Sequence, residues 1–213
     1  MSDGALPLPI VDGFDLQDSV RTILRPDELL TDEHGSARRL PRFFYRIDSW
    51  QIALDLDVSP HFKLWEFIGV DVREASLQRL FPRYVPCAIT LLAAHLELVR
   101  DVLGSYVHIS ANGAYRSPGH ALTRYASTHC WGTAANIYRV GDEWYNDRES
   151  IQRASTLIRG IMTPLWVRPY GDAVGEADDH IHVDIGYALL EPRGAAGRDP
   201  EVEHRTQAEA VEA

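Results

Sequence analysis

Residues 178–185 read DDHIHVDI, in which polar and apolar side chains alternate after the opening aspartate pair. A period of two is typical of a β-strand, because successive side chains point to opposite faces of the sheet. We expect the isoleucine and valine side chains to pack against helices. The other face, with His180, His182 and Asp184, would line a cleft. The segment therefore predicts a sheet that is covered on one side and carries polar groups on the other.

Two amphipathic helices and several short strands surround this segment. Apolar side chains recur at steps of three and four over residues 86–103, with Gly104 where a C-cap belongs, and residues 147–162 show the same period. Strand-like runs cover residues 43–47, 50–56, 106–110, 133–140, 165–167 and 180–187, and short helices are expected at residues 26–30 and 73–80. The mixture predicts an α+β fold with a small, mainly antiparallel sheet flanked by helices.

The composition divides the chain into three parts. Residues 1–42 are rich in proline, glycine and charge, which predicts an irregular N-terminal arm. Residues 43–190 carry the periodic elements and form the predicted domain. Residues 191–213 contain few large apolar side chains and are acidic overall, so we expect a disordered tail there.

Charge and cysteine content exclude several classes of function. The chain has 213 residues and a net charge of -10, whereas a nucleic-acid-binding protein needs a basic face. Two cysteines, Cys87 and Cys130, are too few for a disulfide framework. The N-terminus lacks the pattern of a secretory signal, and no apolar run is long enough for a membrane span. We therefore expect a cytoplasmic protein without nucleic-acid or membrane partners.

Two further segments carry residue types that hold metal ions or anions. Residues 127–136 read STHCWGTAAN, and the small residues after His129 let the backbone approach whatever the imidazole binds. Asn136 can return to the same point after a tight turn or bulge. Residues 113–120 read GAYRSPGH and place Arg116 on a tight loop, where its guanidinium can bind a carboxylate. Since two imidazoles presented by one strand are common zinc ligands, the segments together predict a metal site.

In order and spacing, these three segments resemble the M15 family of zinc-dependent D-Ala-D-Ala carboxypeptidases and dipeptidases, which is related in fold to the hedgehog signalling domain. The family's S-x-H-x-x-G-x-A-x-D pattern is matched, with one change, by Ser127, His129, Gly132, Ala134 and Asn136. An acidic residue three positions before a metal-binding histidine is matched by Asp179 and His182. The Y-R-S/T segment is matched by Tyr115, Arg116 and Ser117.

The resemblance covers about residues 62–187. At its start, residues 62–67 read FKLWEF and are similar to a segment of the branch that contains phage endolysins. The resemblance implies a hedgehog/DD-peptidase-like fold. It also implies a bound Zn²⁺ as the cofactor and a small peptide as the substrate.

The resemblance further implies a role for each matched residue. Zinc would be held by His129, Asn136 and His182. Catalysis would use Asp179 as the general base toward zinc-activated water, Arg116 to polarise the scissile carbonyl or hold a carboxylate, and His180 as a support of the transition state in some branches. The substrate site would include Arg116, Tyr115 and Ser127.

Asn136 departs from the family pattern, which has aspartate at this position. Asparagine offers a neutral carbonyl oxygen, which suits hard cations such as Ca²⁺ better than zinc. Three alternatives follow. The protein holds zinc weakly and still hydrolyses its substrate; another side chain completes the metal shell, namely Asp184, His180 or His120; or catalysis is lost and only the fold is kept.

The sequence therefore predicts a zinc-dependent peptidase or amidase that hydrolyses an amide bond in a small or D-amino-acid-containing, peptidoglycan-like peptide. One alternative is a catalytically impaired module of the same fold that binds a peptide or protein partner. Another is an enzyme that reuses the metal pocket for other chemistry. The identity of the metal, the scissile bond and the oligomeric state remain open at this stage.

Overall fold

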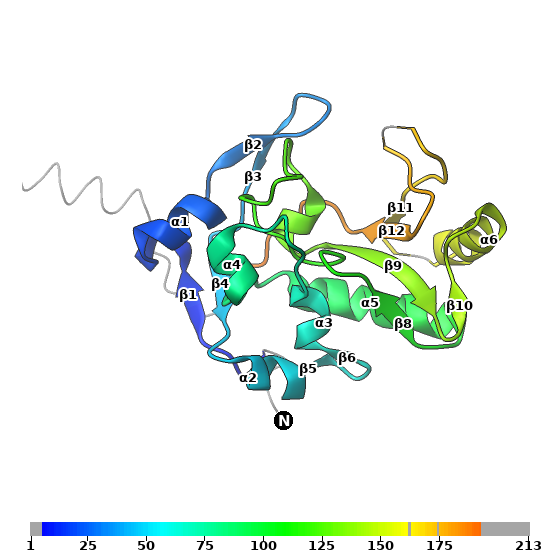
Figure 1. Cartoon of the computed structure of the whole chain (residues 1–213), viewed down its shortest axis with the longest axis horizontal. Coiled ribbons are helices and arrows are strands. Elements are labelled where there is room, and N and C mark those ends of the chain that lie inside the picture. Colours follow the sequence, from blue (N-terminus) through cyan, green and yellow to red (C-terminus); the bar gives the residue numbers. More distant parts are fainter. Residues whose placement is uncertain (1–5, 162, 174, 193–213) are drawn as a thin grey trace, which may run out of the picture.

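Antiparallel sheets and the helices around them make up the described part of the chain, which is residues 6–161, 163–173 and 175–192 of a computed structural model. A five-stranded sheet occupies one half of the molecule and a three-stranded sheet the other, with two small hairpins beside them (Figure 1). Every pair of strands is antiparallel in the described residues. This confirms the predicted α+β class with small antiparallel sheets.

The five-stranded sheet is built on β9 (Ala134–Val140). Its first half pairs with β12 (Ile181–Asp184), and β12 pairs in turn with β11 (Trp166–Val167). Its second half pairs with β8 (Val107–Ile109) and β10 (Glu143–Trp144). In the β9–β12 register, Asn136 lies opposite His182. Residues directly opposite each other on antiparallel strands share a face, so the pairing brings these two side chains together.

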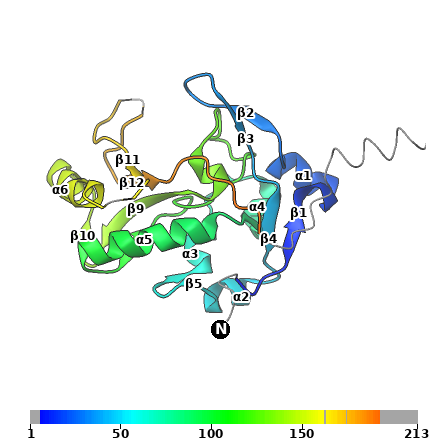
Figure 2. The same ribbon diagram turned by 180° about the vertical axis from the view of Figure 1, so that it is seen from behind.

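Two long helices cover the sheet as predicted. α5 (Ile89–Leu103) packs against β8 and β9 through a buried apolar stripe, and it is nearest the viewer in Figure 2. Gly104 ends this helix with a φ of 70°, a conformation that glycine adopts without steric cost. α6 (Arg148–Arg159) begins at Asp147, whose carboxylate accepts a hydrogen bond from the Ser150 N–H.

The strand predicted over residues 50–56 is wrong, because Trp50–Asp55 form the helix α2. The Ser49 hydroxyl caps this helix by accepting a hydrogen bond from the Ile52 N–H. The run WQIALDL fits a helical period as well as a strand period, and Ala53 alone among the helical residues is fully buried. Ser49 just before this run is a typical helix N-cap, and this favours the helix over the strand.

The N-terminal region is more regular than the sequence indicates. β1 (Ile10–Asp12) pairs with β4 (Phe43–Arg46), and β4 pairs with β7 (Tyr84–Pro86), which makes the three-stranded sheet. An ion pair of 2.6 Å between Asp12 and Arg42 fastens the segment to the start of β4. The prediction of an irregular arm is thus wrong, because β1 finds its pairing partner more than thirty residues further along the chain.

Residues 26–30 are not helical. The helix in this region is α1 (Asp18–Leu24), after the short 3₁₀ turn η1 (Gly13–Asp15). It ends before Pro26, and β2 (Leu29–Thr31) then pairs with β3 (Ala37–Arg39) to form a projecting hairpin. A proline directly after a helix C-terminus is common, since proline cannot continue the backbone hydrogen bonds.

The remaining elements link the two sheets. A hairpin is formed by β5 (Asp57–Ser59) and β6 (Phe62–Lys63), and two short helices follow as α3 (Leu64–Ile68) and α4 (Ser76–Leu80). The 3₁₀ turn η2 (Thr128–Trp131) leads into β9. None of the described helices is long and apolar enough to cross a membrane. Residues 193–213 of the predicted tail lie outside the described residues.

Candidate metal centre

His129 and His182 come together although they lie more than fifty positions apart in the chain. His129 sits on η2 and His182 on β12, and each residue is 2% exposed. The centroids of the two imidazole rings are 5.1 Å apart and the ring planes are inclined at 70°. The structure therefore places the two predicted nitrogen ligands in one buried group.

Each imidazole has one nitrogen engaged by an acceptor. His129 Nδ1 lies 2.7 Å from the Ala114 carbonyl oxygen, and His182 Nε2 lies 3.0 Å from Asp184 Oδ2. Because both partners can only accept, these nitrogens donate, and neutral His129 keeps a lone pair on Nε2, whereas His182 Nδ1 faces a further oxygen, that of Asn136. Anchoring of one imidazole nitrogen by a carbonyl or carboxylate is typical of metal-binding histidines.

Asn136 supplies an oxygen to the same group. Its Oδ1 atom lies 2.9 Å from His182 Nδ1. The chain returns from His129 to this point because Gly132 turns tightly with a φ of 69°, a conformation that favours glycine. A cation between the two atoms would satisfy this contact, as would a proton on His182 Nδ1 or an amide turned so that its Nδ2 donates. Asn136 thus lies against His182, and among the described residues no hydrogen bond joins its side chain to His129.

The spacing of the two rings can be compared with zinc geometry. With zinc–nitrogen distances of about 2.1 Å and a tetrahedral angle, two imidazole centroids lie about 5 Å apart. The observed 5.1 Å is compatible with this value and equally with an ordinary edge-to-face contact between two rings. No group of three or more His, Cys, Asp or Glu side chains in the described ranges is placed to hold a metal ion. A metal here would thus depend on two imidazoles and one amide oxygen.

Electrostatics keep both rings neutral. Burial lowers the pKa of His129 well below its ordinary value, and the positive charge of Arg116 lowers it further. Burial also lowers the pKa of His182, although the Asp184 carboxylate acts in the opposite direction. A metal ligand must carry no proton on the coordinating nitrogen, so neutral rings are the form that binds metal.

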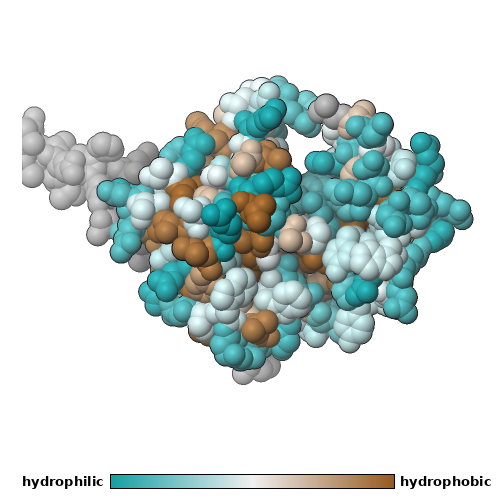
Figure 3. Space-filling view, in the orientation of Figure 1, coloured by the Kyte–Doolittle hydropathy of each residue, from teal (hydrophilic) through white to brown (hydrophobic). Residues whose placement is uncertain are grey.

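An open cavity of about 420 Å³ reaches the site. Its lining includes His182, Asp184, Ser127, Trp166 and Arg168 on the sheet side. The opposite wall is formed by residues of the β2–β3 hairpin, so the N-terminal region contributes to the site. Figure 3 shows the hollow between that hairpin and the segments around β11. A larger cavity of about 650 Å³ lies between β1, α1 and α4, and it is lined by no histidine or cysteine.

Of the loop residues predicted to contact substrate, Arg116 and Ser127 are bonded to each other, whereas Tyr115 is buried in the core. Arg116 Nη2 donates to Ser127 Oγ at 3.0 Å, and the Arg116 backbone N–H donates to the His129 carbonyl, which ties this arginine to the histidine pair. Tyr115 is 1% exposed and packs in the hydrophobic core. Its ring therefore supports the loop, and its contact with substrate stays a prediction without structural support.

Asp179 and His180 lie on the exposed segment before β12. The Asp179 side chain is 78% exposed and forms a short hydrogen bond with His180 Nδ1. In the described part of the chain, no hydrogen bond or ion pair joins Asp179 to the two buried histidines or to Asn136. Asp179, the predicted general base, is therefore close to His182 in sequence, but its carboxylate is bonded to the adjacent residue His180.

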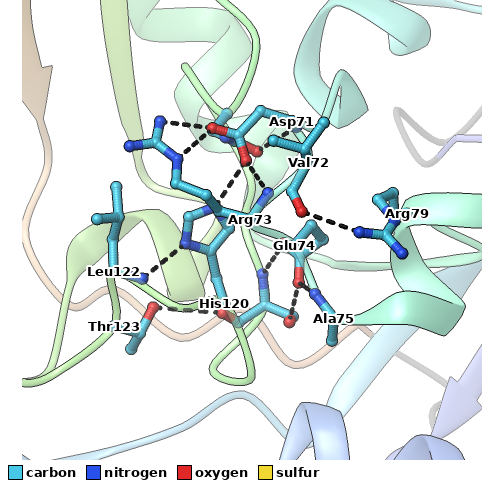
Figure 4. Close-up of polar contacts among 11 residues, drawn as sticks. Asp71, Val72, Arg73, Glu74, Ala75, Arg79, His120, Leu122 and Thr123 are labelled. Carbon is cyan, nitrogen blue, oxygen red and sulfur yellow. Dashed lines mark hydrogen bonds and ion pairs between the residues drawn. The ribbon is translucent and has the colours of Figure 1, made fainter.

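Two of the alternative ligands are engaged elsewhere. His120 accepts from the Leu122 N–H at Nδ1 and contacts Asp71 at Nε2, as Figure 4 shows. Asp184 holds the far nitrogen of His182 and accepts from the Gly186 N–H. Asp184 thus orients a candidate ligand rather than completing the shell.

Sequence reasoning missed Glu74, which holds the Arg116 loop. Glu74 is 4% exposed, and its carboxylate accepts hydrogen bonds from the Ser117 N–H at 3.0 Å and the Ser117 hydroxyl at 2.5 Å. The same carboxylate accepts from the Ala75 N–H (Figure 4). No local pattern marks this residue, because its partner lies 43 positions away.

We expect Glu74→Ala to destabilise the protein by about 2–4 kcal/mol, since it leaves buried donors of Ser117 without an acceptor. Urea denaturation of both proteins measures the loss. Glu149→Ala is the matched control, because Glu149 is exposed and its side chain forms an ion pair with Arg153 of its own helix. A loss no larger than that of the control would contradict a structural role for Glu74.

Comparison with known proteins adds no relative. No protein-family model, curated protein or solved structure matches this chain. The functional argument therefore depends on the arrangement of residues described above.

Proposed function

We propose that the protein is a metal-dependent hydrolase that cleaves an amide bond in a small peptide, with the M15-like, hedgehog/DD-peptidase-like arrangement that the sequence motifs imply. The observation that carries the proposal is the pairing of His129 and His182 in one buried group, each with one ring nitrogen anchored by an acceptor, and the Asn136 amide oxygen 2.9 Å from His182 Nδ1. A zinc ion held there would supply Lewis acidity and lower the pKa of a bound water to about 7.

The chain's own groups then account for binding and positioning. A cavity of about 420 Å³ has the size of a small-ligand site. Arg116 does not itself line this cavity, but it is held by Ser127 of the cavity wall and by the backbone of His129, and it would supply a positive charge for a carbonyl or carboxylate of the substrate. Asp179 would accept a proton once its exposed side chain leaves His180. Catalytic contacts commonly tighten only when the substrate is bound, so we expect Asp179 to reorient in the complex.

A second function, peptide binding without catalysis, is favoured by one observation. The Asp179 carboxylate is exposed and paired with His180, and Asn136 brings no negative charge to the site. Both features suit a pocket that binds a ligand without turning it over.

One experiment separates the two functions. The protein, purified without a metal-affinity tag and loaded with zinc, is incubated with a panel of dipeptides and acyl-dipeptides of L- and D-alanine, and amine release is followed. Hydrolysis that falls about 100-fold or more in Asp179→Ala supports the hydrolase, since general bases contribute about 10²–10⁴-fold. Asp178→Ala, which removes the adjacent carboxylate, is the matched control. Binding of a peptide without hydrolysis, unchanged by Asp179→Ala, would instead support the binding module.

A further inference from the structure

The cavity between β1, α1 and α4 is separate from the candidate metal centre. Its volume of about 650 Å³ lies within the range of ligand sites, and no residue that lines it also lines the 420 Å³ cavity. None of the sequence motifs described above includes a residue of this cavity. The proposed hydrolysis therefore gives it no role.

One polar side chain in this cavity is buried without a partner. Gln78 of α4 is 3% exposed and lines the cavity. Its Oε1 atom is buried and accepts no hydrogen bond from a described residue, and no hydrogen bond of its Nε2 atom occurs among them either. An unpaired buried carboxamide is unfavourable, because it loses its hydrogen bonds to water and gains none within the protein. A ligand that both donates and accepts hydrogen bonds would satisfy it.

Apolar side chains form much of the lining and continue beyond it. Val20 of α1 and Leu77 and Leu80 of α4 line the cavity, and the two leucines are 43% and 77% exposed. Val72, whose carbonyl accepts from Arg79 of the same helix, is 79% exposed and lies outside the lining. Figure 3 shows hydrophobic side chains gathered over α1 and α4. Neighbouring exposed apolar groups of this kind are typical of a surface that binds another protein.

The charged residues of the cavity are separated along β1. Arg83 lies at the end where β1 begins, because its carbonyl accepts from the Ile47 N–H while the neighbouring Arg46 N–H donates to the Pro9 carbonyl. Asp15 of η1 follows the other end of the strand. Arg83 is exposed, and its guanidinium forms no hydrogen bond or ion pair with a described residue. An acidic group on the occupant would therefore be complementary to this end of the cavity.

We propose that this cavity binds an extended segment of a partner protein, with apolar side chains and an acidic group at the end that meets Arg83. A peptide group offers one N–H and one C=O, and the carboxamide of Gln78 can pair with both. In a helical ligand these groups are already bonded within the helix, so an extended segment is the form that satisfies Gln78. The source is a protein, because the exposed apolar surface continues past the cavity to Val72.

Fluorescence anisotropy on the full chain measures the binding of labelled peptides. The first probe is Glu-Leu-Val-Leu-Glu, blocked at both ends, which offers an acidic group in either direction of binding. The second probe has glutamine in place of glutamate, and the third is the first probe N-methylated at its three central residues. We expect the first probe to bind at least 10-fold more tightly than either of the others. EDTA is present, so that neither a metal nor hydrolysis contributes.

Gln78→Met should weaken binding of the first probe at least 10-fold and raise the melting temperature by about 2–4 °C. Methionine nearly preserves the volume of the side chain and removes the unpaired carboxamide. Gln51→Met is the matched control, because Gln51 is exposed on α2 and lies outside the cavity. Arg83→Gln should remove the preference for the acidic probe over the glutamine probe.

Three results would overturn the peptide site. A lower melting temperature in Gln78→Met would show that the carboxamide is turned over and bonded within the protein. Equal binding of the first and third probes, or no binding up to about 1 mM, would show that no peptide group is recognised. Dimers in sedimentation equilibrium that Leu80→Glu abolishes, without binding of the first probe, would assign the apolar surface to a second copy of this chain.

Discussion

His182→Gln should weaken zinc binding at least about 100-fold, the largest effect we expect from any single substitution in this protein. His182 has one nitrogen fixed by Asp184 and the other beside Asn136 Oδ1, so its replacement removes a ligand and the contact that positions it. Loss of a contact that merely orients a ligand already costs about 10–100-fold in affinity. Glutamine nearly preserves the volume of the side chain, which limits the cavity left in the core.

Competition with a chromophoric chelator at pH 7.5 measures the affinity. His95→Gln is the matched control, because His95 lies on α5, where its ring hydrogen-bonds to the Leu91 carbonyl of its own helix. Equal zinc affinities for the His182 variant and the unmodified protein would show that zinc binds elsewhere, and the proposed centre would have to be abandoned.

Asn136→Asp should raise zinc affinity by about 10–100-fold and make it more dependent on pH. A carboxylate adds a negative charge where the amide oxygen now lies 2.9 Å from His182 Nδ1. Without metal, the new carboxylate would favour a proton on His182 and raise the pKa of that ring. Zinc must displace this proton, so binding would release it and strengthen as the pH rises through that pKa.

Affinity is measured between pH 5.5 and 8.5, with Asn146→Asp as the control, since Asn146 is exposed and adds the same charge at a distance. A variant that binds zinc no better than the unmodified protein at any pH would mean that Asn136 does not face the metal. The amide would then have its Nδ2 directed at His182 as a simple hydrogen-bond donor.

The sequence predicts the elements that carry the site better than the contacts that complete it. Periodicity locates β9, β12 and α5, and alternation correctly places Ile181 and Val183 in the core. It does not show that His182 and Asp184 are also buried. Their burial depends on the five-stranded sheet and on segments packed over it. The alternation of side chains along one strand contains no information about those distant segments.

The remaining gaps have one physical cause. β1 pairs with β4 and Glu74 holds Ser117, and in both cases the partners are distant in the chain. Local patterns report propensity and periodicity, whereas such contacts are decided by how whole elements pack. The wrong prediction for α2 has a different cause. Ser49 is present in the sequence as a helix cap, and it is a stronger signal than the ambiguous spacing of the apolar residues that follow.

The pairing of β1 with β4 also bears on self-association. β4 is rich in aromatic residues, with Phe43, Phe44 and Tyr45 in succession, and β1 occupies one of its two edges. If β1 were removed or detached, that edge would present unpaired N–H and C=O groups beside apolar side chains, which is a template for strand addition by a second chain. Pairing with β1 therefore covers an edge of β4 that could otherwise accept a strand from a second chain.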